Sequence, residues 1–136
     1  LGAKKQKAWL SDQSFARKFG LETVDTAGEY ELLALRFDGS APPRFAPGAR
    51  RQTTGEDGLV VYFSDQCPFI LQRVEKLRTY CLEHAIPAHF RRVSSREMAK
   101  ALPCVFNNWA IFYDGTFVTV NQIDGAGLGK IIRRTH

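Results

Sequence analysis

The stretch Leu59-Val60-Val61-Tyr62-Phe63, followed by Ser64-Asp65-Gln66-Cys67-Pro68-Phe69, decides the fold of this chain. Five apolar residues in a row predict a buried central strand. Beyond the proline, apolar residues recur at the spacing of one helical face: Ile70, Val74, Leu77 and Cys81. Proline suits the first turn of a helix. The stretch therefore predicts a strand, a tight turn and a helix that runs from Pro68 to about Ala85.

The residues after this helix complete an α/β unit. The apolar pattern and the turn residues predict five further elements: a strand over 86–93, a short helix over 96–101, strands over 109–113 and 116–120, and a helix over 125–134. Asp114-Gly115 between the last two strands is a strong hairpin signal. The predicted order is β-α-β-α-β-β-α, which is the order of thioredoxin-like folds.

The first forty residues have a different character. They predict a helix that ends at Gly20, followed by strands over 21–26 and 30–37. Residues 39–58 are rich in proline, glycine and charge, which predicts a polar linker or a long ordered loop. Such a long loop is uncommon inside one compact domain. We therefore expect a first domain over 1–38, a linker over 39–58 and a second domain over 59–136.

Length and composition exclude several classes of protein. The chain has 136 residues and no run of eighteen apolar ones, so we expect no membrane partner. A net charge of +5 without a basic helix does not favour nucleic acid. Three cysteines and three scattered histidines give neither a disulfide framework nor a metal site, which favours a cytoplasmic location. Because the chain begins with Leu1, we expect an artificial boundary, a processed product or a fragment of a longer protein.

Cys67 is the candidate nucleophile. It stands between the central strand and the helix that begins at Pro68. The N–H groups of a first helical turn and the helix dipole stabilise a thiolate at this position. The alternative is a small apolar residue that packs a turn. The sequence therefore predicts either a reactive thiol or a structural cysteine at this turn.

Cys67-Pro68-Phe69 resembles the Cys-Pro-aromatic-Cys turn of glutaredoxins, but Ile70 stands where the second cysteine would be. Dithiol exchange therefore cannot close within the motif. Cys81 lies on the apolar helical face and is expected in the core. Cys104 follows Pro103 in the loop that passes near the active turn of thioredoxin-like folds. Cys104 is thus the candidate resolving thiol, subject to strict disulfide geometry.

Two strings look as if they bind nucleotides but lack the required pattern. Residues 125–130, Gly-Ala-Gly-Leu-Gly-Lys, do not have the spacing of a P-loop. Residues 52–57, Gln-Thr-Thr-Gly-Glu-Asp, partly match the pyrophosphate loop of acetyltransferases. Asp57 stands there in place of a small residue, and no helix start follows to hold an anion. Neither string is expected to bind a nucleotide.

Two further resemblances identify families. The run from Phe15 to Thr26, with Tyr30-Glu31-Leu32-Leu33-Ala34-Leu35, resembles the last helix and two strands of GNAT N-acetyltransferases. The runs over 64–69 and 112–119 resemble the YoaP-like domain that is appended to some bacterial GNAT proteins. The chain is thus similar to the C-terminal part of a GNAT acyltransferase followed by a YoaP-like, thioredoxin-like domain.

The resemblance implies a bacterial parent protein that transfers acetyl groups from acetyl-CoA to an amine. The N-terminal acyltransferase half would hold acetyl-CoA, so this chain alone would have no cofactor. That half, or a second chain, is the implied protein partner. Phe15 and Phe19 occupy the helix where GNAT proteins often carry a tyrosine general acid. The resemblance therefore places that role in the missing half.

Two other functions stay open beside the acyltransferase. The second domain could be a monothiol redox or thiol-transfer module that uses Cys67 on a small thiol substrate. It could instead be a non-catalytic interaction domain, in which the N-terminal strands pair with another sheet edge.

Overall fold

A computed structural model describes residues 2–4 and 13–135 of the chain. The N-terminal part forms a three-stranded antiparallel sheet in the order β1-β3-β2, with one short helix beside it. Its elements are β1 (Gly2–Lys4), α1 (Gln13–Lys18), β2 (Glu22–Ala27) and β3 (Tyr30–Ala34). We call this the N-terminal unit. The helix and two of its strands agree with the sequence prediction.

Two details of this unit differ from the prediction. The short strand β1 pairs with β3 and was not predicted from its lysine-rich sequence. Strand β3 ends at Ala34 and not at Phe37. Its last pair is Ala34 with Glu22, because β2 begins only after Gly20 has turned the chain out of α1 with a φ of +84°. Beyond this pair no described strand pairs with the residues that follow β3, and the side chain of Phe37 is 90% exposed.

The second half of the chain forms a mixed four-stranded sheet in the order β5-β4-β6-β7. Its elements are β4 (Leu59–Phe63), α2 (Pro68–Glu83), β5 (Ala88–Arg92), α3 (Arg96–Ala101), β6 (Trp109–Tyr113), β7 (Thr116–Thr119) and α4 (Gly125–Thr135). β4 is parallel to β5 and antiparallel to β6, and β6 is antiparallel to β7. The order of elements is the predicted β-α-β-α-β-β-α. We call this the C-terminal unit.

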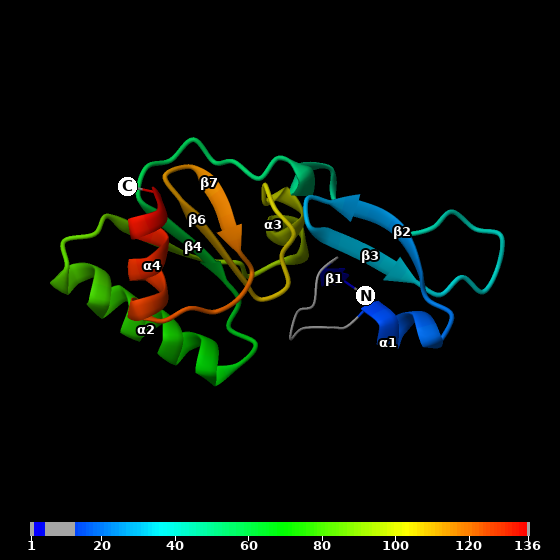
Figure 1. Cartoon of the computed structure of the whole chain (residues 1–136), viewed down its shortest axis with the longest axis horizontal. Coiled ribbons are helices and arrows are strands. Elements are labelled where there is room, and N and C mark those ends of the chain that lie inside the picture. Colours follow the sequence, from blue (N-terminus) through cyan, green and yellow to red (C-terminus); the bar gives the residue numbers. More distant parts are fainter. Residues whose placement is uncertain (1, 5–12, 136) are drawn as a thin grey trace.

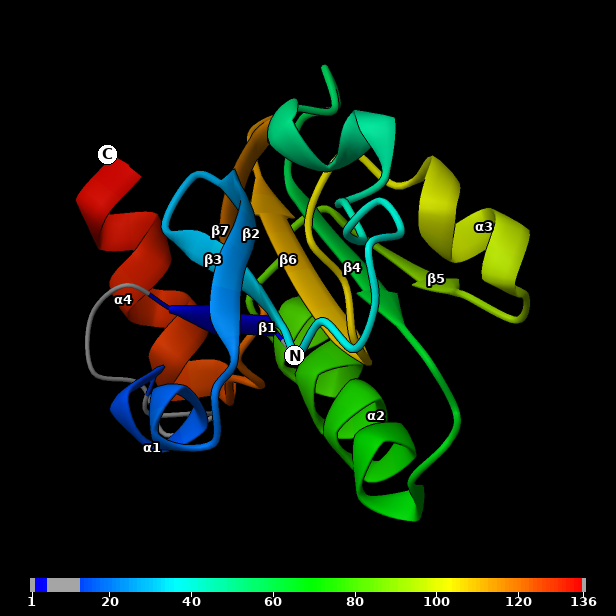
Figure 2. The same ribbon diagram turned by 90° about the vertical axis from the view of Figure 1, so that its right-hand side faces the viewer.

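Side chains of the central strands alternate between two apolar clusters. Leu59, Val61 and Phe63 point to the face that α2 and α4 cover, where Trp109 and Leu128 are also buried. The neighbouring positions point to the opposite face, beside α3: Val60, Ala110 and Phe112. Figures 1 and 2 show α2 and α4 together on one side of this sheet and α3 on the other. Burial on both faces explains why β4 is continuously apolar.

The segment between the two units is an ordered loop. It contains the 3-10 helix η1 (Pro47–Arg50), and beyond it the backbone follows the β6–β7 hairpin. The N–H of Gln52 donates to the carbonyl of Pro103 at 2.7 Å, and its carbonyl accepts from Phe117 at 3.0 Å. The N–H of Thr54 donates to Gly115 at 2.9 Å. Of the two alternatives that the sequence left open, the structure has the long ordered loop.

Asp25 and Tyr30 join the N-terminal unit to the rest of the chain. The carboxylate of Asp25 accepts a hydrogen bond from the N–H of Phe45 at 2.8 Å and pairs with Arg50 of η1. Arg50 also donates to the carbonyl of Thr26 at 3.0 Å. The ring of Tyr30 meets that of Phe117 in β7 at 6.1 Å. Both units therefore contact the loop or each other through buried groups.

Among the described residues, no helix combines the length and the apolar character that crossing a membrane requires.

Candidate functional site

A polar cleft lies where the parallel strands β4 and β5 end. Its volume is about 350 Å³. The walls come from three segments: residues 64–66 after β4, residues 92–96 at the end of β5 and the start of α3, and residues 106–107 before β6. The carboxyl ends of parallel strands are the usual place for binding sites in open α/β sheets. This cleft is therefore the candidate functional site.

Ser64 lies at the base of the cleft. The residue is 5% exposed, and its backbone N–H donates to the carbonyl of Asn108 at 3.0 Å. Its hydroxyl is buried and has no hydrogen-bond partner among the residues that the structure describes. A buried polar group without a partner costs free energy, and among the described residues Glu31 and Trp109 also have such an atom but do not line the cleft. The hydroxyl of Ser64 thus offers an unused donor and acceptor to a ligand in the cleft.

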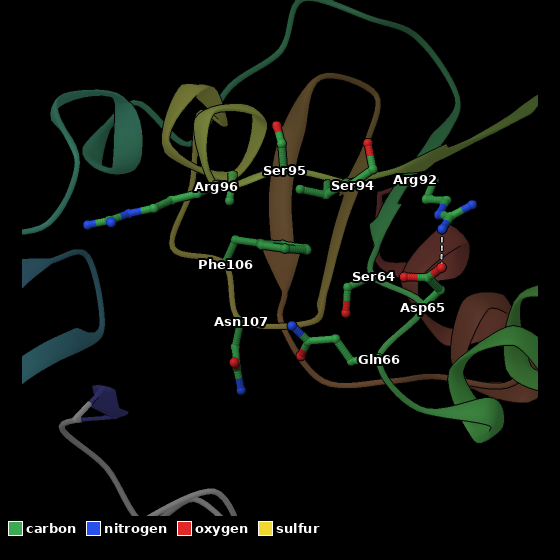
Figure 3. Close-up of a pocket in the computed structure, with 11 residues that line it drawn as sticks. Ser64, Asp65, Gln66, Arg92, Ser94, Ser95, Arg96, Phe106 and Asn107 are labelled. Carbon is green, nitrogen blue, oxygen red and sulfur yellow. Dashed lines mark hydrogen bonds and ion pairs between the residues drawn. The ribbon is translucent and has the colours of Figure 1, made fainter.

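Asp65 and Arg92 form an ion pair at the edge of the cleft. One carboxylate oxygen of Asp65 accepts a hydrogen bond from the Arg92 guanidinium. Figure 3 shows that this contact lies on the outer side, while the second carboxylate oxygen of Asp65 faces the cleft. The two side chains are 39% and 59% exposed, so water competes with the pair. The pair is therefore open to a ligand that competes for Asp65.

The opposite wall is formed by Phe106 and the start of α3. In Figure 3 the Phe106 ring projects toward the side of Ser64, and the Gln66 side chain lies below it. The Ser95 hydroxyl caps α3 by accepting from the N–H of Met98 at 3.1 Å, and the Ser94 hydroxyl contacts the Met98 sulfur at 3.4 Å. These two serines have partners within the protein. Ser64 differs from them in this respect.

Arg96 lines the cleft with the aliphatic part of its side chain. In Figure 3 its guanidinium points away from Ser64, and the amide of Asn107 also points outward. The polar groups that face the interior are thus those of three consecutive residues, Ser64, Asp65 and Gln66.

Cys67 follows these residues and occupies the predicted position at the start of a helix. It is the N-cap of α2, with extended backbone angles and no hydrogen bond from its side chain to the helix. The thiol is free and half-buried. Cys67 packs against the apolar cluster between the sheet and α2, and its side chain does not line the cleft. Cys67 is therefore next to the cleft residue Gln66 in the chain, but its side chain lies in an apolar environment outside the cleft.

The structure does not bring Cys104 to Cys67. Cys104 is 3% exposed and belongs to the cluster on the α3 face of the sheet, opposite to that of Cys67. Burial raises the pKa of the Cys104 thiol to about 12. A resolving role would require Cys104 to leave this cluster. Cys81 lies on the core-facing side of α2, as its helical position predicted, and burial raises its pKa as well.

A second, smaller hollow of about 180 Å³ lies beside the loop that precedes β4. Arg91 donates to both carboxylate oxygens of Glu56 there, at 2.6 and 2.7 Å, and approaches the Tyr62 hydroxyl at 3.4 Å. The Arg91 hydrogen bonds hold the pKa of Glu56 below its ordinary value. Arg91 and Glu56 match each other's charge, and the hollow is about half the volume of the cleft, so it is a weaker candidate.

The string over 52–57 does not form a loop suited to the pyrophosphate of acetyl-CoA. In the string 52–57, residues 52–54 run beside the β6–β7 hairpin, and Glu56 presents a carboxylate that is bound to Arg91. An acid there repels phosphate, and a strand and not a helix follows. No group of three or more His, Cys, Asp or Glu suited to a metal occurs within the described ranges.

The cleft was not predicted from the sequence, because the predicted site centred on Cys67. Ser64, Asp65 and Gln66 were predicted as part of a tight turn and of a run that resembles the YoaP-like domain, and neither they nor Arg92 were predicted to line a site. The position of these residues in the chain could have predicted the cleft. Polar residues directly follow two strands that are parallel neighbours, and such residues meet at one edge of the sheet.

Comparison with known proteins agrees with part of the expected family relationship. Residues 87–130, from the approach to β5 through the start of α4, match the YoaP-like family. The chain is also 31% identical over 121 residues to the "Uncharacterized N-acetyltransferase YoaP" of Bacillus subtilis (strain 168). This alignment covers 88% of the chain and 48% of the relative, so the chain spans about half of that protein's length. No solved structure matches the chain significantly.

Proposed function

We propose that this chain is the C-terminal portion of a bacterial GNAT-type N-acetyltransferase that transfers an acetyl group from acetyl-CoA to an amine. The similarity to a protein named as an N-acetyltransferase carries the proposal. It covers 88% of the chain and therefore includes both units. A similarity confined to residues 87–130 would support only an appended YoaP-like domain.

The proposal assigns different tasks to different parts of the protein. Residues 1–38 supply the last helix and strands of an acyltransferase sheet, and residues 39–58 connect them to the domain over 59–136. The longer protein binds acetyl-CoA outside this chain, since the string 52–57 does not suit the cofactor. The C-terminal unit then shapes or regulates the substrate-binding side of the enzyme through the cleft at Ser64.

We further propose that the C-terminal unit is related to thioredoxin-like folds. The order of its elements and the parallel pairing of β4 with β5 support this relationship. The antiparallel β6–β7 hairpin, which completes the sheet beside β4, supports it too. This kinship concerns the fold and assigns no activity by itself.

The test compares this chain with the longer protein that includes the N-terminal half. Calorimetric titration with acetyl-CoA should give binding to the longer protein and none to the present chain. Acetylation of a panel of primary amines, followed by mass spectrometry, should then require the longer protein. A longer, folded protein that neither binds acetyl-CoA nor acetylates any amine would contradict the proposal.

A thiol-transfer activity of Cys67 is the second candidate. The observation in its favour is a free, half-buried thiol at the N-cap of the 16-residue helix α2. Its test is alkylation of each cysteine as a function of pH, resolved by peptide mass spectrometry. A reactive Cys67 should be alkylated faster than Cys81 and Cys104, whose burial opposes thiolate formation. Thiol transfer that persists in Cys67→Ser would exclude this candidate.

A further inference from the structure

We infer that the cleft at Ser64 binds the alkylammonium group of a small amine. This inference rests on the proposed function for one point, namely that the bound amine is the acetyl acceptor. The binding itself follows from the groups that line the cleft. We assign no bond-forming step to it.

The polar atoms that face the cleft are suited to a cation that donates hydrogen bonds. They are the Ser64 hydroxyl oxygen, the inner carboxylate oxygen of Asp65 and the side-chain amide of Gln66. An ammonium group has three donors and no acceptor. It can therefore donate to the buried Ser64 hydroxyl, which has no partner in the described part of the chain, and to the Asp65 carboxylate at once.

Phe106 suits the remainder of such a ligand. Its ring lines the cleft and projects toward the side of Ser64 (Figure 3). The face of an aromatic ring attracts a cation within about 6 Å, and it also packs well against methylene groups. A short alkylamine combines both features. The volume of about 350 Å³ lies at the small end of the range for ligand pockets, which agrees with a small molecule or a single side chain.

An anion fits the cleft less well, although two arginines lie along it. The Arg92 guanidinium is bonded to Asp65 at the edge, and the guanidinium of Arg96 points away from the interior. The charged group that faces inward is thus the carboxylate of Asp65. A bound anion would lie beside this carboxylate, and the donors that face it would be the uncharged groups of Ser64 and Gln66.

The ion pair gives the inference a specific consequence. An ammonium group that binds Asp65 competes with Arg92 for the same carboxylate. Replacing Arg92 by glutamine should therefore strengthen amine binding several-fold, whereas replacing Asp65 by asparagine should weaken it. A merely structural ion pair predicts no gain in affinity on removal of its arginine.

The experiment is a titration of the ¹⁵N-labelled chain with n-butylammonium chloride, followed by NMR. A ligand this small should bind in the millimolar range. Shift changes should centre on residues 64–66 and Phe106. Asp65→Asn should weaken binding about tenfold or more, because charge-assisted hydrogen bonds contribute most. Asp38→Asn is the matched control, because Asp38 bonds to Ser40 in an exposed loop, and it should leave the affinity unchanged.

One uncharged probe, one anionic probe and one peptide complete the test. N-butylacetamide and butyrate have similar size but lack the ammonium group, and each should bind at least tenfold more weakly. A peptide with one lysine and blocked ends tells a free amine from a protein side chain as the source of the ammonium group. Tighter binding of the peptide than of butylammonium would assign a protein substrate, and weaker binding a small molecule.

The inference is overturned if the neutral or anionic probe binds as tightly as butylammonium. It is also overturned if the affinity is unchanged in Asp65→Asn or not raised in Arg92→Gln, with NMR spectra that confirm both variants are folded. These outcomes are independent of the proposed function. Amine acetylation by the longer protein without binding at this cleft would refute the inference alone, and binding without acetylation would refute the proposed function alone.

Discussion

Asp25 in the N-terminal unit and Ser64 in the C-terminal unit are both buried polar residues, and their environments differ. Asp25 accepts hydrogen bonds from the N–H groups of Thr26 and Phe45 and pairs with Arg50. Ser64 keeps a hydroxyl without a partner among the described residues. The first arrangement joins two parts of the fold. The second leaves polar capacity unused at the base of a cleft, as expected where a ligand completes the site.

The surroundings of the two residues differ in the same way. The buried cluster of the N-terminal unit consists of Ala16 and Leu33, with Leu21 packed against it. The C-terminal unit has two larger clusters, one on each face of its sheet. Several large apolar side chains on the N-terminal unit are exposed: Phe15, Phe19, Leu35 and Phe37. A small core gains much of its stability from contacts with neighbouring parts of the chain. We call the contacts of Asp25 and Tyr30 with the loop and β7 the joint, and we expect the N-terminal unit to depend on this joint more than the C-terminal unit does.

The largest expected effect tests this difference in core size. Trp109 is fully buried in the C-terminal unit, and Trp109→Ala should cost about 3–5 kcal/mol of unfolding free energy. Leu33→Ala in the smaller cluster should cost less, about 2–3 kcal/mol. Urea titration followed by circular dichroism measures both values.

Hydrogen exchange shows where each variant opens. Leu33→Ala should raise exchange in β2 and β3 and leave β4 and β6 protected. Trp109→Ala should raise exchange in both sheets, because the joint at Asp25 and Tyr30 depends on the larger unit. Equal loss of protection everywhere in Leu33→Ala would mean that the chain unfolds as one unit, and the contrast between the two regions would not hold.

Acid should weaken the joint at Asp25. The hydrogen bond from the N–H of Phe45, with those from Thr26 and Arg50, holds the pKa of this carboxyl below its ordinary value of 3.8. A lowered folded-state pKa stabilises the fold above the unfolded value and loses that contribution as the pH falls through the folded one. Wild type should therefore lose stability below about pH 4 relative to Asp25→Asn, and the two curves should converge at lower pH.

Glu56→Gln is the control for the acid experiment. Glu56 also has a lowered pKa, caused first by its hydrogen bond to Arg91, but it lies outside the joint. Both variants should flatten the acid limb of the melting temperature against pH. Only Asp25→Asn should also raise hydrogen exchange in β2 and β3 at pH 7. The same exchange increase in Glu56→Gln would contradict the role of Asp25 as the joint.

Much of this fold could be predicted from the sequence because local signals agreed with the final contacts. The apolar run over 59–63 is central in its sheet, and the helix begins at Pro68 as predicted. Asp114-Gly115 forms the hairpin, with φ of +47° and +78°. The element order of the C-terminal unit follows from these signals. The strand β1 was missed because its pairing with β3 is non-local and its sequence is not apolar.

The cleft could be predicted only in part. The sequence places Ser64, Asp65 and Gln66 after a central strand, but their relation to Arg92 and Phe106 depends on which strands are parallel neighbours. The candidate pairing of Cys67 with Cys104 was drawn from a fold resemblance. Spacing along the chain does not reveal that the two thiols belong to clusters on opposite faces of the sheet.

The smallest expected effect compares two serines of the cleft under the same substitution. Ser95 caps α3 through a hydrogen bond to Met98, so Ser95→Ala should lower the unfolding free energy by about 1 kcal/mol. Ser64 buries a hydroxyl that no described residue satisfies, so Ser64→Ala should raise it by about 1 kcal/mol. Urea titrations at one pH measure both changes.

The opposite signs are the informative result. A stabilising Ser64→Ala that also weakens butylammonium binding means that Ser64 is kept for a ligand at the expense of stability, which is how functional sites often differ from structural ones. A loss of stability as large as that of Ser95→Ala would mean that the Ser64 hydroxyl has a structural partner. The contrast with the fully bonded Asp25 would then disappear, and the cleft would lose its strongest support as a binding site.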